Sequence, residues 1–194
     1  MAQTVISTKC SALVIGGSAG SLDVLLEIFP NLNENLKFPI IIVVHRKANN
    51  ESLLTDLLKH RTPLKVSEAD EKVRLKNGEV YIAPADYHLL VEEDHSLSLD
   101  YSEKINYSRP SIDVTFQSAA EVFKEGLVCV LLSGSNADGV EGLKAVNKFG
   151  GTAVIQDPTT AMMPYMPQQA DLNVKPLLVM HSFEMAEYIN KLNY

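Results

Sequence analysis

The sequence predicts an α/β domain with a doubly wound, mostly parallel sheet. Short runs that are apolar on both faces alternate with segments of helical periodicity, a pattern typical of parallel strands that helices cover on both sides. The predicted strands are 12–15, 40–44, 128–132, 153–155 and 177–180, and the predicted helices are 21–29, 51–59, 112–123, 139–149 and 183–192. The 194 residues are 46% hydrophobic and hold no low-complexity linker. They therefore predict a single domain with a sizeable core.

Two regions between these elements follow other patterns. Residues 80–83, 88–91 and 97–99 are short apolar runs separated by turn residues such as Asn77-Gly78. They predict antiparallel hairpins, either at an edge of the sheet or folded over it. Residues 156–173 hold several prolines and little regular pattern, which predicts a long functional loop. Ser111 directly follows Pro110 and is the expected N-cap of the helix 112–123.

Charge and composition exclude several classes of protein. The chain has 24 acidic and 17 basic residues, and an acidic chain is a poor partner for nucleic acid, which needs clustered Lys and Arg. No run approaches the roughly 18 apolar residues of a membrane span, and no secretory signal is visible at the N-terminus. We therefore expect a cytoplasmic protein without membrane insertion. Cys10 and Cys129 are expected to be buried, reduced thiols.

The turn after the first predicted strand suits two kinds of chemistry. It reads Gly16-Gly17-Ser18-Ala19-Gly20-Ser21 and leads into a helix. Backbone N–H groups at a helix start bind a phosphate or stabilise an oxyanion beside a nucleophilic serine. The glycines do not have the G-x-G-x-x-G register, and the second strand ends in His45 rather than in an acidic residue. A dinucleotide site is therefore disfavoured.

Three residues follow predicted parallel strands at one edge of the sheet, where such sheets bind ligands. They are Ser18, His45 and Asp138. Nucleophile, general base and orienting carboxylate are the groups that acyl transfer requires. Each residue also has an ordinary structural role available, as a helix cap, a surface histidine or a helix-start carboxylate. The pattern alone leaves both interpretations open, because the order of strands is not in the sequence.

Six short motifs occur in order along the chain. They are Ile15-Gly16-Gly17-Ser18-Ala19-Gly20, Ile41-Ile42-Val43-Val44-His45, Val80-Tyr81-Ile82-Ala83-Pro84 with His88, Arg109-Pro110-Ser111-Ile112-Asp113, Leu131-Leu132-Ser133-Gly134 with Asp138-Gly139, and Met166-Pro167 with Ala170. In these motifs, over most of its length, the chain resembles the catalytic domain of the chemotaxis protein-glutamate methylesterases (CheB). The resemblance implies a doubly wound sheet with an antiparallel hairpin.

The same resemblance implies a Ser-His-Asp hydrolase that removes methyl groups from glutamate methyl esters of chemoreceptors. Some relatives also deamidate receptor glutamines. Ser18 is then the nucleophile, His45 the base and Asp138 the residue that orients it. The reaction needs no cofactor, and the five histidines lack the HxH or HExxH spacing of a metal site. Further candidates for oxyanion or substrate contacts are Ala19, Gly134, Ser135, His88, Tyr165 and Met166, with His88 alternatively a supporting residue.

The chain departs from the family pattern at two places near these candidates. Gly134-Ser135-Asn136 stands where the family has Gly-Met-Gly, and Tyr165 stands where it has a glycine. Asn tolerates a positive φ better than most residues, so the turn can be retained. If the altered turn instead closes the oxyanion hole, the chain is a catalytically impaired regulatory or receptor-binding module. A tyrosine at 165 is expected to narrow the mouth of the site or to contact substrate.

The expected partner is a methylated chemoreceptor or a similar signalling protein. Well-known family members carry an N-terminal receiver domain, whereas the nucleophile motif starts near residue 15 of this chain. We therefore expect residues 1–194 to be a catalytic domain without a receiver domain. Its activity is then constitutive or controlled by a separate response regulator.

Overall fold

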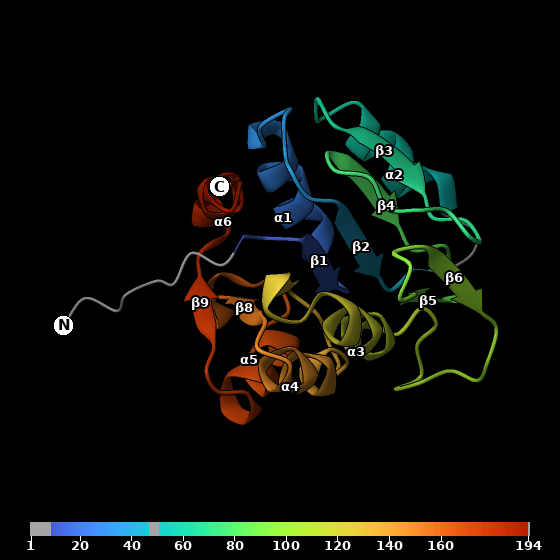
Figure 1. Ribbon diagram of the computed structural model, residues 1–194. Coiled ribbons are helices and arrows are strands. Elements are labelled where there is room, and N and C mark those ends of the chain that lie inside the picture. Colours follow the sequence, from blue (N-terminus) through green and yellow to red (C-terminus); the bar gives the residue numbers. More distant parts are fainter. Residues whose placement is uncertain (1–8, 47–50, 194) are drawn as a thin grey trace.

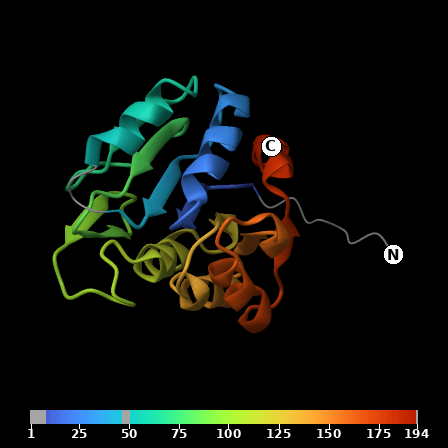
Figure 2. The same cartoon turned by 180° about the vertical axis from the view of Figure 1, so that it is seen from behind.

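The chain folds around a seven-stranded sheet with helices on both faces (Figures 1 and 2). The computed structural model describes residues 9–46 and 51–193. In sheet order the strands are β3 (Lys65–Glu68), β4 (Glu79–Ile82), β2 (Ile40–Val44), β1 (Ala12–Gly17), β7 (Leu127–Leu131), β8 (Thr152–Gln156) and β9 (Leu178–Met180). All neighbouring pairs are parallel, which confirms the predicted fold class.

The helices divide the core into two layers. One face of the sheet is covered by α1 (Ser21–Ile28), α2 (Glu51–Lys59) and α6 (Ser182–Lys191), and the other by α3 (Ile112–Phe123), α4 (Val140–Lys148) and α5 (Tyr165–Asn173). Short 3₁₀ helices span Phe29–Asn31, Lys124–Gly126 and Pro158–Thr160. Side chains alternate between the layers along each strand, so that Ile15 packs in the first and Val14 in the second. Among the described residues, no helix has both the length and the apolarity that a membrane crossing requires.

The order in which strands are added to the sheet reverses at β1. The chain builds β2, β4 and β3 on one side of β1 and then returns to place β7, β8 and β9 on the other side. Gly17 is paired with Val44 of β2, and Gly16 with Leu131 of β7. Ligands of open α/β sheets bind beyond the carboxyl ends of the strands at such a switch point. The residues that follow β1, β2 and β7 lie there.

The hairpin prediction is correct for two of its three runs. β5 (His88–Val91) and β6 (Leu97–Asp100) form a two-stranded antiparallel sheet beside α3, but the run 80–83 does not join it. Its residues form the parallel strand β4, which is buried on both faces between β2 and β3. Gly78 has φ +74° and donates its N–H to Phe38 O, so the turn at Asn77-Gly78 leads the chain into the main sheet. Strand β3 was not predicted.

The predicted loop 156–173 is wrong in its second half, which is the helix α5. Pro167 is the third residue of this helix, and proline is tolerated there because the first-turn N–H groups have no partner within a helix. The final strand β9 is an edge strand with exposed Leu178 and Val179, and not a strand covered on both faces as its apolar run predicts. Cys10 and Cys129 are free and buried, as expected.

Candidate active site

Ser18 and His45 follow adjacent strands at the carboxyl edge of the sheet. The His45 N–H donates to Gly17 O at 3.2 Å, which continues the pairing of β1 with β2. On the other side, the Ser18 N–H donates to Ser133 O at 2.9 Å, beyond the end of β7. Neighbouring strands lie about 4.8 Å apart. The backbone of Ser18 therefore lies between the backbone of His45 and that of the turn that leads to Asp138.

Asp138 is fully buried and holds His45 by a hydrogen bond of 2.7 Å between Oδ2 and Nε2. The N-terminus of α3 supplies most of its other donors. These are Ser111 Oγ at 2.9 Å, Ile112 N at 2.7 Å, Asp113 N at 3.0 Å and, from the residue after Asp138, Gly139 N at 3.1 Å. Ser111 is also the N-cap of α3, as predicted, since it accepts from Val114 N. The start of a helix thus positions this carboxylate.

The surroundings of Asp138 determine which nitrogen of His45 carries a proton. Burial raises the pKa of Asp138, but the hydrogen bonds from His45 and from the N–H groups of Asp113 and Ile112 outweigh it and hold the pKa below its usual range. The ionised carboxylate accepts from Nε2–H. His45 Nδ1 is then left as the nitrogen that accepts a proton.

A second buried carboxylate, Asp113, supports the same turn. Its Oδ1 accepts from Gly139 N at 2.9 Å and from Gly142 N at 2.7 Å. Burial raises its pKa to about 7, and the charge of Asp138 acts in the same direction, while the hydrogen bonds from Gly142 and Gly139 oppose the shift. Sequence reasoning assigned no role to Asp113, although it belongs to one of the motifs of the resemblance.

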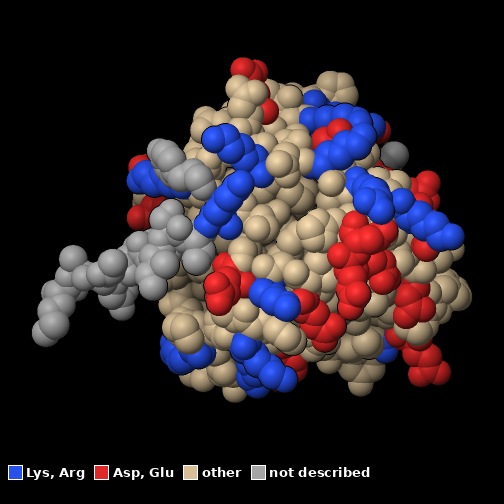
Figure 3. Space-filling view, viewed as in Figure 1, with Lys and Arg blue, Asp and Glu red and all other residues tan. Residues whose placement is uncertain are grey.

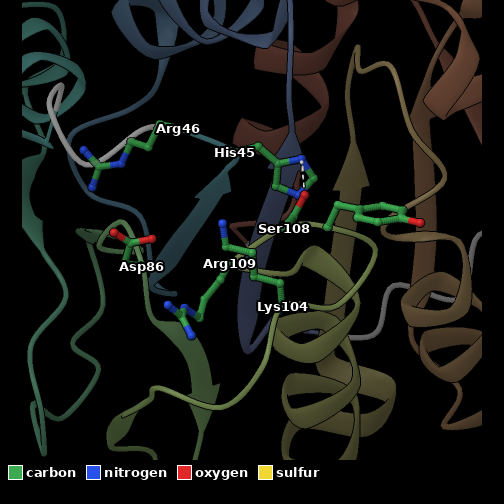
Figure 4. A pocket seen from close by; sticks show the side chains of 7 residues that line it. His45, Arg46, Asp86, Lys104, Ser108 and Arg109 are labelled. Carbon is green, nitrogen blue, oxygen red and sulfur yellow. Dashed lines mark hydrogen bonds between the residues drawn. The ribbon is translucent and has the colours of Figure 1, made fainter.

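The Ser18 hydroxyl makes no hydrogen bond within residues 9–46 and 51–193. The free nitrogen of His45, Nδ1, instead lies 3.4 Å from Ser108 Oγ (Figure 4). The backbone of Ser18 is nevertheless well held, because its carbonyl accepts from both N and Oγ of Ser21, at 3.0 and 2.6 Å. The structure thus brings Ser18, His45 and Asp138 to one edge, with the bond between His45 and Asp138 formed.

The turn that carries Ser18 is closely packed against the side chains of Met162 and Ser133. Gly20 has φ +82°, and a Cβ on it would lie 2.7 Å from both Met162 Cβ and Ser133 Oγ. Ser133 Oγ donates to Ala19 O at 2.7 Å and accepts from Met163 N at 2.9 Å. This serine therefore ties the nucleophile turn to the segment before α5. Its role was not predicted, because it depends on contacts with residues far away in the chain.

The candidate oxyanion donors differ in their availability. Gly134 N–H donates to Met163 O at 3.0 Å, so this candidate is already occupied. The N–H groups of Ala19 and Ser135 have no hydrogen-bond partner within the described part of the chain. Asn136 was expected to retain the turn by adopting a positive φ, but its φ is not positive. Its side-chain oxygen instead accepts a hydrogen bond from Asp138 N at 3.1 Å.

The remaining candidates divide into buried and exposed residues. Met166 is fully buried, and a Cβ on Gly134 would lie 2.6 Å from its Sδ. The Met166 side chain packs against the turn at Gly134, and its predicted contact with substrate stays a prediction. His88 is also buried, where its Nδ1 accepts from Ser111 N at 3.1 Å and its Nε2 donates to Glu103 O at 2.9 Å. It supports the site, whereas Tyr165 is half exposed at the start of α5.

A cavity of about 440 Å³ lies beside His45. Besides His45, it is lined by Arg46, Asp86, Lys104, Tyr107, Ser108 and Arg109 (Figure 4). Most of these residues belong to the polar connection before α3, of which the sequence singled out only Arg109, as the first residue of a motif of the resemblance. No group of three or more potential metal ligands occurs in the part of the chain that the structure describes.

Comparison with known proteins gives one consistent result. The family model described as CheB methylesterase matches residues 13–189. A Leptospira interrogans protein, provisionally named a protein-glutamate methylesterase/protein-glutamine glutaminase, is 44% identical over 159 residues, which are 82% of each chain. A protein of that name from Thermotoga maritima is 37% identical over 80% of this chain, which spans about half of that protein (46%). The crystal structure of the Thermotoga maritima CheB methylesterase catalytic domain has a TM-score of 0.89 and 32% identity, and the match covers 95% of this chain and all of that one (100%).

Proposed function

Because the chain belongs to the CheB methylesterase family, we propose that it hydrolyses glutamate methyl esters on a signalling protein and releases methanol. Its substrate is a methylated chemoreceptor or a similar protein. The observation that carries the proposal is the 2.7 Å hydrogen bond between His45 and the buried Asp138, beside the turn of Ser18. A base with an orienting carboxylate next to a serine is the arrangement that acyl transfer requires.

In the first half of the reaction, Ser18 Oγ attacks the carbonyl carbon of the ester while His45 Nδ1 takes the hydroxyl proton. Asp138 keeps the other ring proton on Nε2 and stabilises the charged imidazole. The tetrahedral intermediate then collapses, and the bond from carbon to the methoxy oxygen breaks. His45 returns the proton to this oxygen, methanol leaves and the glutamyl group stays on Ser18 as an ester.

In the second half, His45 Nδ1 takes a proton from water, and the hydroxide oxygen attacks the same carbon. The bond to Ser18 Oγ breaks, the serine regains the proton and the glutamate carboxylate is released. The same steps on a glutamine side chain release ammonia instead of methanol. We propose this deamidation as a second activity, because the relatives named above are also named glutaminases.

The negative charge on the carbonyl oxygen needs donors that are free to turn towards it. The N–H of Ala19 is the first candidate, because it directly follows Ser18 and has no partner among the described residues. Ser135 N–H, on the opposite turn, is the second. Loss of one such donor typically costs about 3 kcal/mol in the transition state.

A second candidate function is a non-catalytic binding module with the same fold. The observation that favours it is the Ser18 hydroxyl, which makes no hydrogen bond in the described part of the chain, while His45 Nδ1 faces Ser108. The two functions differ in the reactivity of Ser18. An enzyme activates this serine, and a binding module does not.

The test is to label the protein with a serine-directed fluorophosphonate and to map the modified residue. Methanol release from methylated receptor fragments is then measured for the unchanged protein, Ser18→Ala and the matched control Ser182→Ala at the start of α6. We expect the adduct on Ser18, and methanol release that disappears in Ser18→Ala only. Equal rates in Ser18→Ala and the unchanged protein exclude the mechanism, and an unlabelled Ser18 supports the binding module.

We also propose that residues 1–194 act as one catalytic domain in the cytoplasm, with an activity that is constitutive or controlled by a separate response regulator. Support for one domain comes from the site itself, whose residues follow β1, β2 and β7 and which α3 completes. Two free, buried thiols suit a reducing compartment. Addition of a phosphorylated response regulator to the methanol assay tests the control.

A further inference from the structure

The cavity beside His45 has an unusual balance of charge for this protein. The chain has a net charge of −7, yet three basic side chains, Arg46, Lys104 and Arg109, line this cavity with a single carboxylate, Asp86. Figure 4 shows the basic side chains arranged around Asp86 on one side of His45. We refer to this cavity as the cation pocket, because cationic side chains line it.

One other region of the molecule has the opposite charge. Acidic side chains gather on the side of the molecule that carries the β5–β6 hairpin (Figure 3). A groove there is lined by Glu71, Glu92, Glu93 and Asp94, among others. The basic character of the cation pocket therefore does not follow from the average composition of the surface. It is a local feature next to the candidate base.

The three basic residues of the pocket are held in different ways. Arg46 forms an ion pair with Glu68 at 3.0 Å and donates to Ala83 O at 2.9 Å. Arg109 contacts no carboxylate within 4.0 Å in the described part of the chain. Its Nη1 donates to the carbonyl groups of Tyr101 and Ser102, and its guanidinium lies 3.8 Å from the centre of the Tyr101 ring.

Two positive charges of the pocket, Lys104 and Arg109, thus form no ion pair with a carboxylate in the described part of the chain, and Arg109 interacts with Asp100 only at longer range. Lys104 forms no ion pair among the described residues. Arg109 Nε is buried and has no hydrogen-bond partner among them. A buried donor without an acceptor is unfavourable, and the Arg109 guanidinium thus has fewer acceptors than donors.

We infer that the cation pocket binds a carboxylate of the substrate polypeptide, from an acidic residue next to the reacting glutamate methyl ester. The inference rests on the proposed function, since it places the ester at Ser18 and His45. The pocket shares His45 with the reaction site, so a group bound in it lies next to the base that acts on the ester. Lys104 and Arg109 then select acidic neighbours over neutral ones of the same shape.

The experiment compares two synthetic peptides with one glutamate methyl ester and either Glu or Gln as its neighbours. Binding of each labelled peptide is measured by fluorescence anisotropy to Ser18→Ala, which leaves the ester intact. The measurement is repeated with Lys104→Gln and with the matched control Lys148→Gln, both in the Ser18→Ala background. Lys148 lies exposed at the end of α4, outside the pocket. Each series is run at about 20 mM and about 300 mM salt, because salt screens exposed charges.

We expect the Glu peptide to bind about three-fold more tightly than the Gln peptide at low salt, as for a partly exposed charge pair. This ratio falls towards one in Lys104→Gln and at high salt, and it persists in Lys148→Gln. Equal binding of the two peptides, no binding of either, or a ratio that survives in Lys104→Gln overturns the inference.

Two further measurements separate this inference from its premises. The unchanged protein is tested for methanol release from the same two peptides. Absence of methanol from both contradicts the proposed function, while the anisotropy ratio still decides on the pocket. The Gln peptide is also tested after chemical hydrolysis of its ester. If its affinity then depends on Lys104, the pocket holds the product carboxylate, and the assignment to a neighbouring residue is wrong.

Discussion

Asp138 and the turn of Ser18 lie at the same edge of the sheet but are held differently. The Asp138 carboxylate is fully buried and accepts from His45, from Ser111 Oγ and from three backbone N–H groups. The Ser18 hydroxyl makes no hydrogen bond in the described part of the chain, although its backbone is fixed on both sides. The base and its carboxylate are thus assembled before substrate arrives, whereas the nucleophile is positioned only through its backbone. Catalytic hydrogen bonds are often long in free enzymes and shorten in the complex.

We expect the largest effect from a change in the preassembled pair of His45 and Asp138. In Asp138→Asn an amide NH₂ faces the donors that surround the carboxylate, and His45 loses the acceptor that selects its Nε2–H tautomer. We expect methanol release to fall by about 10⁴-fold, together with a loss of stability. Asp56→Asn, an exposed change on α2, serves as the control. A loss below about ten-fold would show that this carboxylate does not orient the base.

On the Ser18 side, the backbone is the sensitive part. Gly20→Ala places a Cβ at φ +82° and 2.7 Å from Met162 Cβ and Ser133 Oγ. We expect unfolding to become easier by roughly 1–3 kcal/mol and the esterase rate to fall with it. Gly150→Ala is the matched control, because Gly150 has φ +85° and its Cβ meets only the side chain of Glu125. It loses stability in thermal or urea unfolding but keeps the rate per folded molecule.

The two buried carboxylates are expected to give pH dependences of opposite sign. Asp113 has its pKa raised to about 7 by burial and by the charge of Asp138. The folded state therefore keeps a proton that the unfolded chain has already lost, and this residue lowers stability as pH rises from about 4 to about 7. Asp138, with a lowered pKa, contributes stability that is present above the unfolded pKa and is lost as pH falls through the folded one.

Asp113→Asn separates the two carboxylates. The amide oxygen still accepts from Gly139 and Gly142, and the cost of ionising a buried carboxyl disappears. We expect the variant to gain roughly 1–2 kcal/mol relative to the unchanged protein at about pH 8 compared with about pH 5, measured by urea unfolding at both values. Asp70→Asn, which is exposed, gives the baseline. A difference that does not change with pH argues against ionisation of Asp113 in this range.

The smallest expected effect tests the contact that competes with Ser18. Ser108 Oγ lies 3.4 Å from His45 Nδ1, which is a weak hydrogen bond. In Ser108→Ala this nitrogen is released, so we expect fluorophosphonate labelling of Ser18 and methanol release to rise by at most about three-fold. Thermal unfolding checks that the fold is unchanged. A ten-fold decrease would instead mean that Ser108 holds His45 in its active position.

Much of the fold was predictable because a buried parallel strand is apolar on both faces and its sequence is easily recognised. Apolar runs were misinterpreted where neighbouring elements determine which structure a run adopts. β4 is a short run beside turn residues, and such a run suits a hairpin and a central strand equally well until its neighbours β2 and β3 are known. α5 was missed because Pro164 and Pro167 dominate the local pattern. Pro164 is the N-cap and Pro167 the third residue of the helix, and a helix start tolerates proline at both positions.

By itself, the sequence determined the α/β class, the strands that Ser18 and His45 follow, the turn that carries Asp138, and the N-cap at Ser111. These are local properties, in which a few adjacent residues set the backbone and the polar group that follows it. Only the tertiary structure decided that β2 and β7 flank β1, that the helix start of α3 holds Asp138, and that Lys104 and Arg109 meet beside His45. Contacts between residues far apart in the chain depend on strand order and packing, which no single segment encodes.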